Sequence, residues 1–408
     1  MEAITASQNF IDEIIASTPD GQRLRLCLQC GACSGVCPFG FIMTYPPHGM
    51  IAALRAGMLE EIIDADTGWM CVSCYACTQV CPAKIPVTAG LTTRVKEEMI
   101  LEGNVPTELQ DALEKAQRYF NPLGESPRKR AEWTKNVKPE IPIMGKAKEP
   151  VEVLWFVGDY ASYHPRVIPS TQSLAKILNT LEVDYGILGP EEVSDGDSLR
   201  LAGESGLYEM LAEKNAQAFE KYEFNEIITS DPHAYNAIKN EYPHLDISYP
   251  VRHYTEFLAE RLDKIESLLK NEIEATVVFH DPCYLGRVNG VFEEPRQLLG
   301  AIPGVELMEM SHNRENSLCC GGGGGGMWLD GFQWEKANVR ISDWRVREAV
   351  SALGSQNRGD PEESKTSILA VACPYEAPRF EDSTKTVPDA GDILVKDISE
   401  LLAEAMDL

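Results

Sequence analysis

Residues 27–38 read CLQCGACSGVCP and residues 71–82 read CVSCYACTQVCP, so the pattern C-x2-C-x2-C-x3-C-P occurs twice. Three thiolates one short turn apart can bind three corners of an iron-sulfur cubane, while the fourth cysteine, followed by proline, reaches the cluster of the other run. The spacing therefore predicts two [4Fe-4S] clusters with exchanged fourth ligands. The first cluster is assigned to Cys27, Cys30, Cys33 and Cys81, and the second to Cys71, Cys74, Cys77 and Cys37.

Zinc and reduced thiols are the alternatives for these cysteines. Zinc sites also use paired C-x2-C, but each takes four ligands and rarely needs two runs of four in this repeat. The connection between the runs includes HGMIAALRAGMLEEIIDA (48–65), in which apolar residues recur at intervals of three and four. This connection predicts a helical ferredoxin-like domain over residues 1–101, unlike the compact bacterial ferredoxin.

Length and composition limit the classes of protein to consider. The 408 residues favour two or three domains, and the formal net charge of −26 argues against nucleic acid or anionic lipid as a partner. No run of about 18 apolar residues is present, and the N-terminus lacks the features of a secretory signal. We therefore expect a cytoplasmic chain, attached peripherally to a membrane at most through partners, whose cysteines bind metal instead of forming disulfides.

The rest of the chain predicts a duplicated α/β unit. Residues 102–150 are interpreted as a helix and an extended linker, and apolar strands then alternate with helices over 151–272 and again over 273–408. The two copies keep similar spacing between marked positions, apart from GSQNRGDPEESKTS (354–367), which predicts a surface loop. The predicted fold class is α+β and multi-domain, with a helical ferredoxin-like domain followed by two α/β repeats.

A third group of cysteines belongs to the second repeat. Cys283 follows a predicted strand, Cys319 and Cys320 precede the glycine run Gly321–Gly326, and Cys373 follows another strand. Parallel strand ends are a common place for sites to assemble, and the amides of Gly321 and Gly322 could donate to a negatively charged cluster. The alternatives are a flexible linker for the glycine run and a vicinal disulfide or buried thiols for the cysteine pair. His280 and His312 could be metal ligands, but we interpret them as hydrogen-bonded structural residues, which is the commoner role of isolated histidines.

In the order of these motifs the chain resembles the heterodisulfide reductase D-type subunit, or the C-type and B-type subunits fused. In that family each repeat carries C, then CCG, then CxxC, which implies a noncubane [4Fe-4S] cluster held by five cysteines. Cys283, Cys319, Cys320 and Cys373 match this pattern, and Glu376 stands in place of the fifth cysteine. The resemblance thus implies one further iron-sulfur cluster, noncubane or variant. LCCGGGGGGMW and VACPYE also resemble the electron-transfer subunit of class II benzoyl-CoA reductase complexes.

The first repeat lacks every one of the family's cysteines. Asp159, Asp195 and Asp231 occupy the corresponding region, either as polar residues at strand ends or as ligands of a hard metal. Glu376 in the second repeat could bind iron, leave an iron open, or lie beside a four-cysteine cluster. Because the family's heterodisulfide cleavage uses two facing noncubane clusters, the resemblance implies that cleavage has been lost here.

The expected function is electron relay in a multi-subunit redox complex, between a flavoprotein of the heterodisulfide reductase A type and another acceptor. A membrane-bound or quinone-linked partner is compatible with this expectation. Two alternatives stay open at this point: reduction of a disulfide or quinone at the third cluster, and a redox sensor or scaffold.

Overall fold

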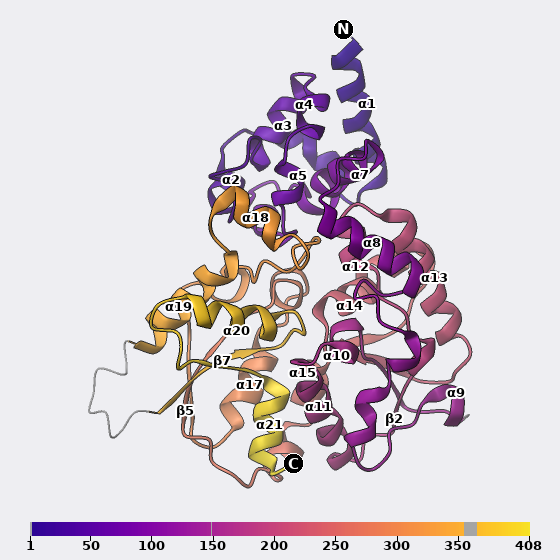
Figure 1. Ribbon diagram of the computed structural model, residues 1–408, viewed down its shortest axis with the longest axis vertical. Helices are drawn as coiled ribbons and strands as arrows, with labels where there is room; N and C mark the ends of the chain where they lie inside the picture. Colours follow the sequence, from indigo (N-terminus) through magenta and orange to yellow (C-terminus); the bar gives the residue numbers. More distant parts are fainter. Residues whose placement is uncertain (1, 148, 355–364) are drawn as a thin grey trace. The chain divides into compact units, whose positions relative to one another are not determined.

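A computed structural model describes residues 2–147, 149–354 and 365–408, and it divides the chain into two compact units (Figure 1). The units are made of the following segments: unit 1 of Met1–Leu113, Ser198–Tyr208 and Gly321–Ile341, and unit 2 of Glu114–Asp197, Glu209–Cys320 and Ser342–Leu408. The domain boundaries derived from the sequence stay predictions. Most of the surface loop predicted at 354–367 lies outside the described residues.

Unit 1 is built of short helices around the cysteine runs. Its helices from the N-terminal part of the chain are α1 (Glu2–Ser17), α2 (Ala32–Val36), α3 (Pro47–Arg55), α4 (Leu59–Ile63), α5 (Thr67–Met70), α6 (Ala76–Val80) and α7 (Thr93–Leu101). The helical pattern of residues 48–65 is interrupted at Gly57, which has φ of +83°. A Cβ atom there would lie 2.9 Å from Ile4 Cγ1. Glycine therefore lets α3 and α4 pack closely against α1, where a larger residue would be strained.

Two segments from the α/β part of the sequence also belong to unit 1. They contain most of α12 (Asp197–Leu201), the start of α13 (Ser205–Phe219), the glycine run and α18 (Asp330–Ala337). In α18, Gln333 Nε2 donates a 3.4 Å hydrogen bond to Trp69 O, and Lys336 forms an ion pair with Asp66. The helical unit is thus completed by residues far along the chain.

Unit 2 contains two four-stranded parallel sheets, ordered β2-β1-β3-β4 and β6-β5-β7-β8. The strands of the first sheet are β1 (Val153–Phe156), β2 (Tyr185–Ile187), β3 (Glu226–Thr229) and β4 (Val251–His253). Those of the second are β5 (Ala275–Phe279), β6 (Val305–Met308), β7 (Thr366–Val371) and β8 (Leu394–Asp397). The identical strand order confirms the predicted duplication of the α/β unit.

The helix that follows the last strand of each repeat begins with the same capping arrangement. His253 caps α15 (Tyr254–Ala259) and Asp397 caps α21 (Ile398–Met406), and in both cases the third helical residue is a glutamate that accepts from the cap's backbone amide. Such capping boxes satisfy amides that the first helical turn leaves unpaired. The same local solution with different cap residues is further evidence of duplication.

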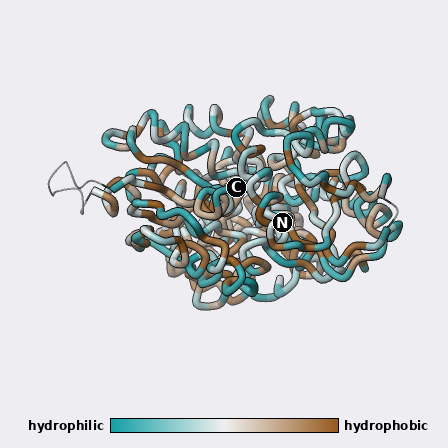
Figure 2. Tube along the Cα trace, turned by 90° about the horizontal axis from the view of Figure 1, so that it is seen from below, coloured by the Kyte–Doolittle hydropathy of each residue, from teal (hydrophilic) through white to brown (hydrophobic). Residues whose placement is uncertain are grey.

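The two repeats share one hydrophobic core. Helices of one repeat pack against helices of the other: α11 (Ile168–Thr180) lies beside α21, and α17 (Glu293–Ala301) lies beside α15 (Figure 1). Central strands β1 and β5 are buried along their whole length, as expected for parallel sheets covered on both faces. Apolar and hydrophilic stretches alternate along the trace, because each outer helix buries only one face (Figure 2).

The stretch that follows α8 (Thr107–Tyr119) is not the extended linker expected from the sequence. It contains short helical turns and ends in α9 (Met144–Ala147). Trp133, Val137 and Ile141 are buried in the core of unit 2, and the Trp133 ring meets that of Trp155 on β1 at 5.3 Å. Its prolines and charges favoured a linker, whereas its widely spaced apolar residues pack against β1 and α11. Of the helices that the structure describes, none is long and apolar enough to span a bilayer.

Candidate iron-sulfur centres

The structure brings Cys27, Cys30, Cys33 and Cys81 together around one cavity of about 330 Å³. Cys27 and Cys30 belong to the loop leading into α2, Cys33 lies in the first turn of α2, and Cys81 follows α6 of the other run. Burial raises the pKa of the Cys33 thiol, and negative charge on Cys27 and Cys81 raises it further. Several thiolates placed this close repel one another, so each thiol resists ionisation. A bound metal ion would balance their charge and hold them as thiolates, and the four cysteines therefore fit a metal site.

Cys37, Cys71, Cys74 and Cys77 form a second, more enclosed set around a cavity of about 20 Å³. Burial raises the pKa of the Cys77 thiol to about 12, against the effect of the Thr88 hydroxyl 3.5 Å away. The pKa of Cys37 is also raised well above its usual value, by burial and by the other three cysteines of the set. The donor set therefore fits a second cluster whose iron would hold the thiols ionised.

The two cysteine loops have the same backbone path. Gln29 and Gly31 in the first loop have positive φ, at 57° and 79°, and Ser73 and Tyr75 in the second have 52° and 60°. These residues lie two and four positions after the first cysteine of each run. Left-handed backbone is costly for non-glycine residues and persists where the surroundings fix it, often at functional sites. The repetition of the strain supports two equivalent ligand loops.

The two sets differ in exposure, which predicts different chemical stability. Cys30 is exposed and the neighbouring Leu28 is 80% exposed, whereas Cys74 and Cys77 are buried. We expect an iron chelator or limited oxygen to remove the cluster of the first set severalfold faster than that of the second, because solvent access governs such loss. Anaerobic addition of chelator, followed by EPR of each reduced cluster, measures the two rates. Equal rates, or faster loss from the second set, would contradict this interpretation of the exposures.

The third site lies at the strand ends of the second repeat. Cys283 follows β5 and Cys373 follows β7, and these strands are neighbours in the sheet. Glu376 begins α20 (Glu376–Thr386), and all four cysteines and Glu376 are buried. The structure thus brings Cys320, Cys373 and Glu376 close enough for their charges to interact. Gly321 and Gly322, predicted to donate amides here, belong to unit 1, and their role stays a prediction.

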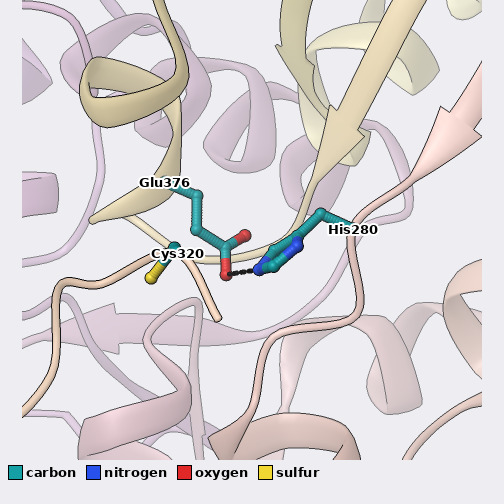
Figure 3. A group of neighbouring side chains, drawn as sticks. All are labelled: His280, Cys320 and Glu376. Atoms are coloured by element: carbon teal, nitrogen blue, oxygen red, sulfur yellow. Dashed lines mark ion pairs between the residues drawn. The ribbon is translucent and has the colours of Figure 1, made fainter. Parts of the chain in front are cut away.

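Glu376 lies beside Cys320 and a histidine (Figure 3). The ligand atoms of His280, Cys320 and Glu376 lie within 4.8 Å of one another, the one such group of three in the described part of the chain. Glu376 Oε1 is 3.2 Å from His280 Nε2, and burial raises the pKa of the carboxyl to about 7. A carboxyl oxygen is therefore available at the position of the family's fifth cysteine.

His280 is held in one tautomer by an arginine. Arg345 Nε donates a 2.9 Å hydrogen bond to His280 Nδ1, so this nitrogen is the acceptor and the proton lies on Nε2. His280 Nε2 is buried and makes no hydrogen bond of good geometry with any described residue. An N-H that faces Cys320 and Glu376 suits donation to cluster sulfur, and it does not suit binding of iron through Nε2. The sequence hinted at this role only by placing His280 three residues before Cys283.

Cys320 has an environment that favours its thiolate form. A hydrogen bond from Cys319 lowers the pKa of Cys320 well below the usual value, and His280 and Arg379 act in the same direction. Arg379 Nε also donates a 3.0 Å hydrogen bond to Cys320 O. A buried thiolate with these neighbours fits a metal ligand and argues against inert buried thiols.

The carboxylates of the first repeat are engaged in structural contacts. Arg130 binds both Asp159 Oδ1, at 2.5 Å, and Glu192 Oε1, at 2.8 Å. Asp231 caps α14 (Pro232–Asn236) through the His233 amide. Within the described ranges, Asp159, Asp195 and Asp231 do not form a compact ligand group. His312, on the surface, is paired with Glu348 and lies apart from the group around Cys320.

Two stretches of the chain match known domain families. Residues 23–85 match the 4Fe-4S dicluster domain, and residues 277–354 match the cysteine-rich domain of the CCG type. A 328-residue alignment with the D-type subunit of the dihydromethanophenazine:CoB–CoM heterodisulfide reductase from Methanosarcina barkeri is 29% identical and covers 79% of this chain and 74% of that protein. This chain is an iron-sulfur protein of the heterodisulfide reductase D-like type.

Longer relatives contain further sequence. The probable iron-sulfur-binding oxidoreductase FadF of Bacillus subtilis is 34% identical over 76% of this chain and 42% of its own length. The EtfAB:quinone oxidoreductase of Syntrophomonas wolfei is 31% identical over 87% of this chain and 48% of its own length. The D-like chain therefore spans about half of the length of these two relatives.

Proposed function

We propose that this D-like chain is an electron-relay subunit that passes single electrons through three iron-sulfur clusters. Its relation to the D-type heterodisulfide reductases makes it an iron-sulfur oxidoreductase subunit, and the relay role is the step beyond. The observation that carries the proposal is the burial of the third donor set: Cys320, Cys373 and Glu376 are each at most 6% exposed. A site closed in this way suits electron transfer better than turnover of a bulky substrate.

Each cysteine set would hold a cluster that accepts and releases electrons when bound. The protein's own groups decide how such clusters are held. The exchanged cysteines Cys37 and Cys81 fix the two loops of unit 1 to each other, and Arg345 orients His280 toward the third donor set. The exposed surface at Cys30 suits electron exchange with a partner, because the site is open to the solvent there.

The partners follow from the class of relatives. The relative from Syntrophomonas wolfei is named an EtfAB:quinone oxidoreductase. This name supports a flavoprotein as the partner on one side of the relay and a quinone-linked acceptor on the other. We propose a cytoplasmic chain that reaches a membrane through such partners. Replacement of all cysteines in the first repeat supports a relay over heterodisulfide cleavage, which in the family uses two facing noncubane clusters.

Anaerobic purification with iron and sulfide analysis tests the number of clusters. Two cubanes would give about eight irons for each chain, and a third four-iron cluster would give about twelve. Rapid mixing with a reduced flavoprotein, followed by EPR, then tests the relay. Reduction of all clusters within the turnover time of the complex supports it, whereas about eight irons and no electron exchange would instead favour a sensor or scaffold.

Replacing Glu376 by cysteine restores the family's five-cysteine pattern. We expect Glu376→Cys to change the EPR signal of the third cluster while the signals of unit 1 stay the same, because a thiolate is a softer ligand than a carboxylate. Glu376→Gln is the matched variant that keeps shape and removes charge. If both variants leave every signal unchanged, Glu376 does not interact with the cluster.

A reductase acting at the third site is the second candidate, and the carboxylate at position 376 favours it, since an oxygen ligand exchanges more readily with a substrate at iron. Added thiols or quinones would then perturb the third EPR signal of the wild type. A signal indifferent to both would leave the relay as the function.

A further inference from the structure

Lys96 of α7 is a buried lysine at the second cysteine set that the cluster assignments leave unexplained. Its side chain is inaccessible to solvent. Its ammonium donates to three backbone carbonyls, those of Cys71 at 2.9 Å, Leu201 at 3.1 Å and Gly324 at 2.8 Å. A lysine ammonium has three protons, so all of its donors are used. The three acceptors come from segments that are remote in sequence but belong to the same unit.

The charge of Lys96 has no carboxylate partner within the described ranges of the chain. Burial of an ammonium without a counter-charge is costly, and neutral carbonyls offset only part of that cost. A buried cation beside a ligand loop is therefore consistent with a negatively charged cluster as its missing counter-charge.

Two glycines allow the remote segments to approach this lysine. Gly324 has φ of +58°, and a Cβ atom there would lie 2.3 Å from Ser73 Oγ and 3.1 Å from Lys96 Nζ. Gly203 has φ of +97°, and a Cβ atom would lie 2.7 Å from Glu97 N. Ser73 lies between Cys71 and Cys74 in the second ligand loop. The glycine run is thus packed tightly against this loop and is not a free linker.

The other ligand loop has a similar contact with a different environment. Arg55 Nη1 donates to Cys27 O at 3.1 Å, and Cys27 opens the first run as Cys71 opens the second. Arg55 is exposed, whereas Lys96 is buried. Water and salt screen an exposed charge much more than a buried one. The chain therefore offers a matched pair of cations at equivalent positions.

We propose that Lys96 is a positioning residue that holds the glycine run Gly321–Gly326 against the second ligand loop and stabilises the reduced form of the cluster bound there. The proposal rests on one part of the proposed function, the binding of a cluster by Cys37, Cys71, Cys74 and Cys77. One-electron reduction adds one negative charge to a cluster, and a nearby buried cation favours that state. Since Gly321 follows Cys320 directly, the same contact connects this loop through the chain to the third donor set.

An EPR-monitored redox titration of the anaerobic holoprotein, with dithionite as the electron donor, tests the electrostatic part. Lys96→Met is expected to make reduction of the second-set cluster at least tenfold less favourable, a negative shift of about 59 mV for one electron, while the first-set cluster keeps its midpoint. Lys96→Arg, which keeps the charge, should recover most of the shift. The control Arg55→Met should shift the first-set cluster by much less, because that charge is screened.

Hydrogen exchange of the amides of residues 321–328 tests the positioning part. Lys96→Met should speed exchange there, and Gly324→Ala should do so as well, because its added methyl group cannot fit beside Ser73. Gly324→Ala also decides the case if Lys96→Met fails to assemble its cluster: faster exchange together with a shifted second-set midpoint supports the proposal. An unchanged midpoint with unchanged exchange, or equal shifts in both clusters, would overturn it. If the midpoints behave as expected but no cluster exchanges electrons with a flavoprotein, the relay function fails and the role of Lys96 stands.

Discussion

Replacing Cys81 by alanine is expected to remove the cluster of the first cysteine run, although Cys81 belongs to the second run. Cys81 lines the same cavity as Cys27, Cys30 and Cys33, and its negative charge raises the pKa of Cys33. With three thiolates left and an exposed fourth corner, the cubane should be lost or reduced to a three-iron form. Iron should fall by about four atoms for each chain if the whole cubane is lost, and EPR should show the second cluster intact.

Cys37→Ala is the reciprocal control. Cys37 lies with Cys71, Cys74 and Cys77, so its loss should affect the cluster of the second run and spare the first. EPR of the two variants, with chelator sensitivity as an independent marker of the exposed cluster, separates the outcomes. Loss of the second-run cluster in Cys81→Ala would show that each run binds its own cluster, and the exchanged assignment would be wrong.

Replacing Arg130 by methionine should have the largest effect on stability outside the cysteine sites. Arg130 is 2% exposed and bridges Asp159 and Glu192 in the first repeat. Glu192 also accepts hydrogen bonds from the Val157 and Gly158 amides, which are neutral donors. Arg130 is therefore the cation that balances the Glu192 charge. Removing one partner of a buried ion pair leaves uncompensated charge, and we expect a loss of about 3–5 kcal/mol in the free energy of unfolding.

Urea unfolding followed by tryptophan fluorescence measures this loss, because Trp133 and Trp155 pack together in the same unit. Lys129→Met is the matched control: Lys129 pairs with Glu125 on the surface, where such a pair contributes at most about 1 kcal/mol. Similar unfolding free energies for the two variants would mean that the Asp159 region tolerates unpaired charge. A large difference would show that the first repeat, without its cysteines, is kept as a stabilising part of the fold.

Much of the fold could be predicted because its signals are local. The spacing of Cys27 to Cys37 and of Cys71 to Cys81 predicted two ligand loops, and the loops share their backbone path. The strand and helix pattern predicted the duplication, which the two identical sheet orders confirm. The matched 4Fe-4S dicluster and cysteine-rich domains support iron-sulfur clusters, and each ligand assignment stays a prediction.

The missed features depend on contacts between residues far apart in sequence. Nothing around Lys96 indicates that its partners are Leu201 and Gly324. The role of His280 depends on Arg345, which lies on α19 (Ile341–Gly354). The residues before α9 were interpreted as a linker because they contain prolines and many charged residues, yet Trp133 and Val137 are buried. Such pairings are decided by tertiary packing, which local patterns do not encode.

The packing of helices of one repeat against helices of the other makes the two repeats dependent on each other. Because α11 packs on α21 and α15 on α17, deleting the first repeat would uncover the apolar faces of two helices in the second. The first repeat, which has no cysteine between residues 151 and 272, therefore forms half of an interior on which the second repeat depends.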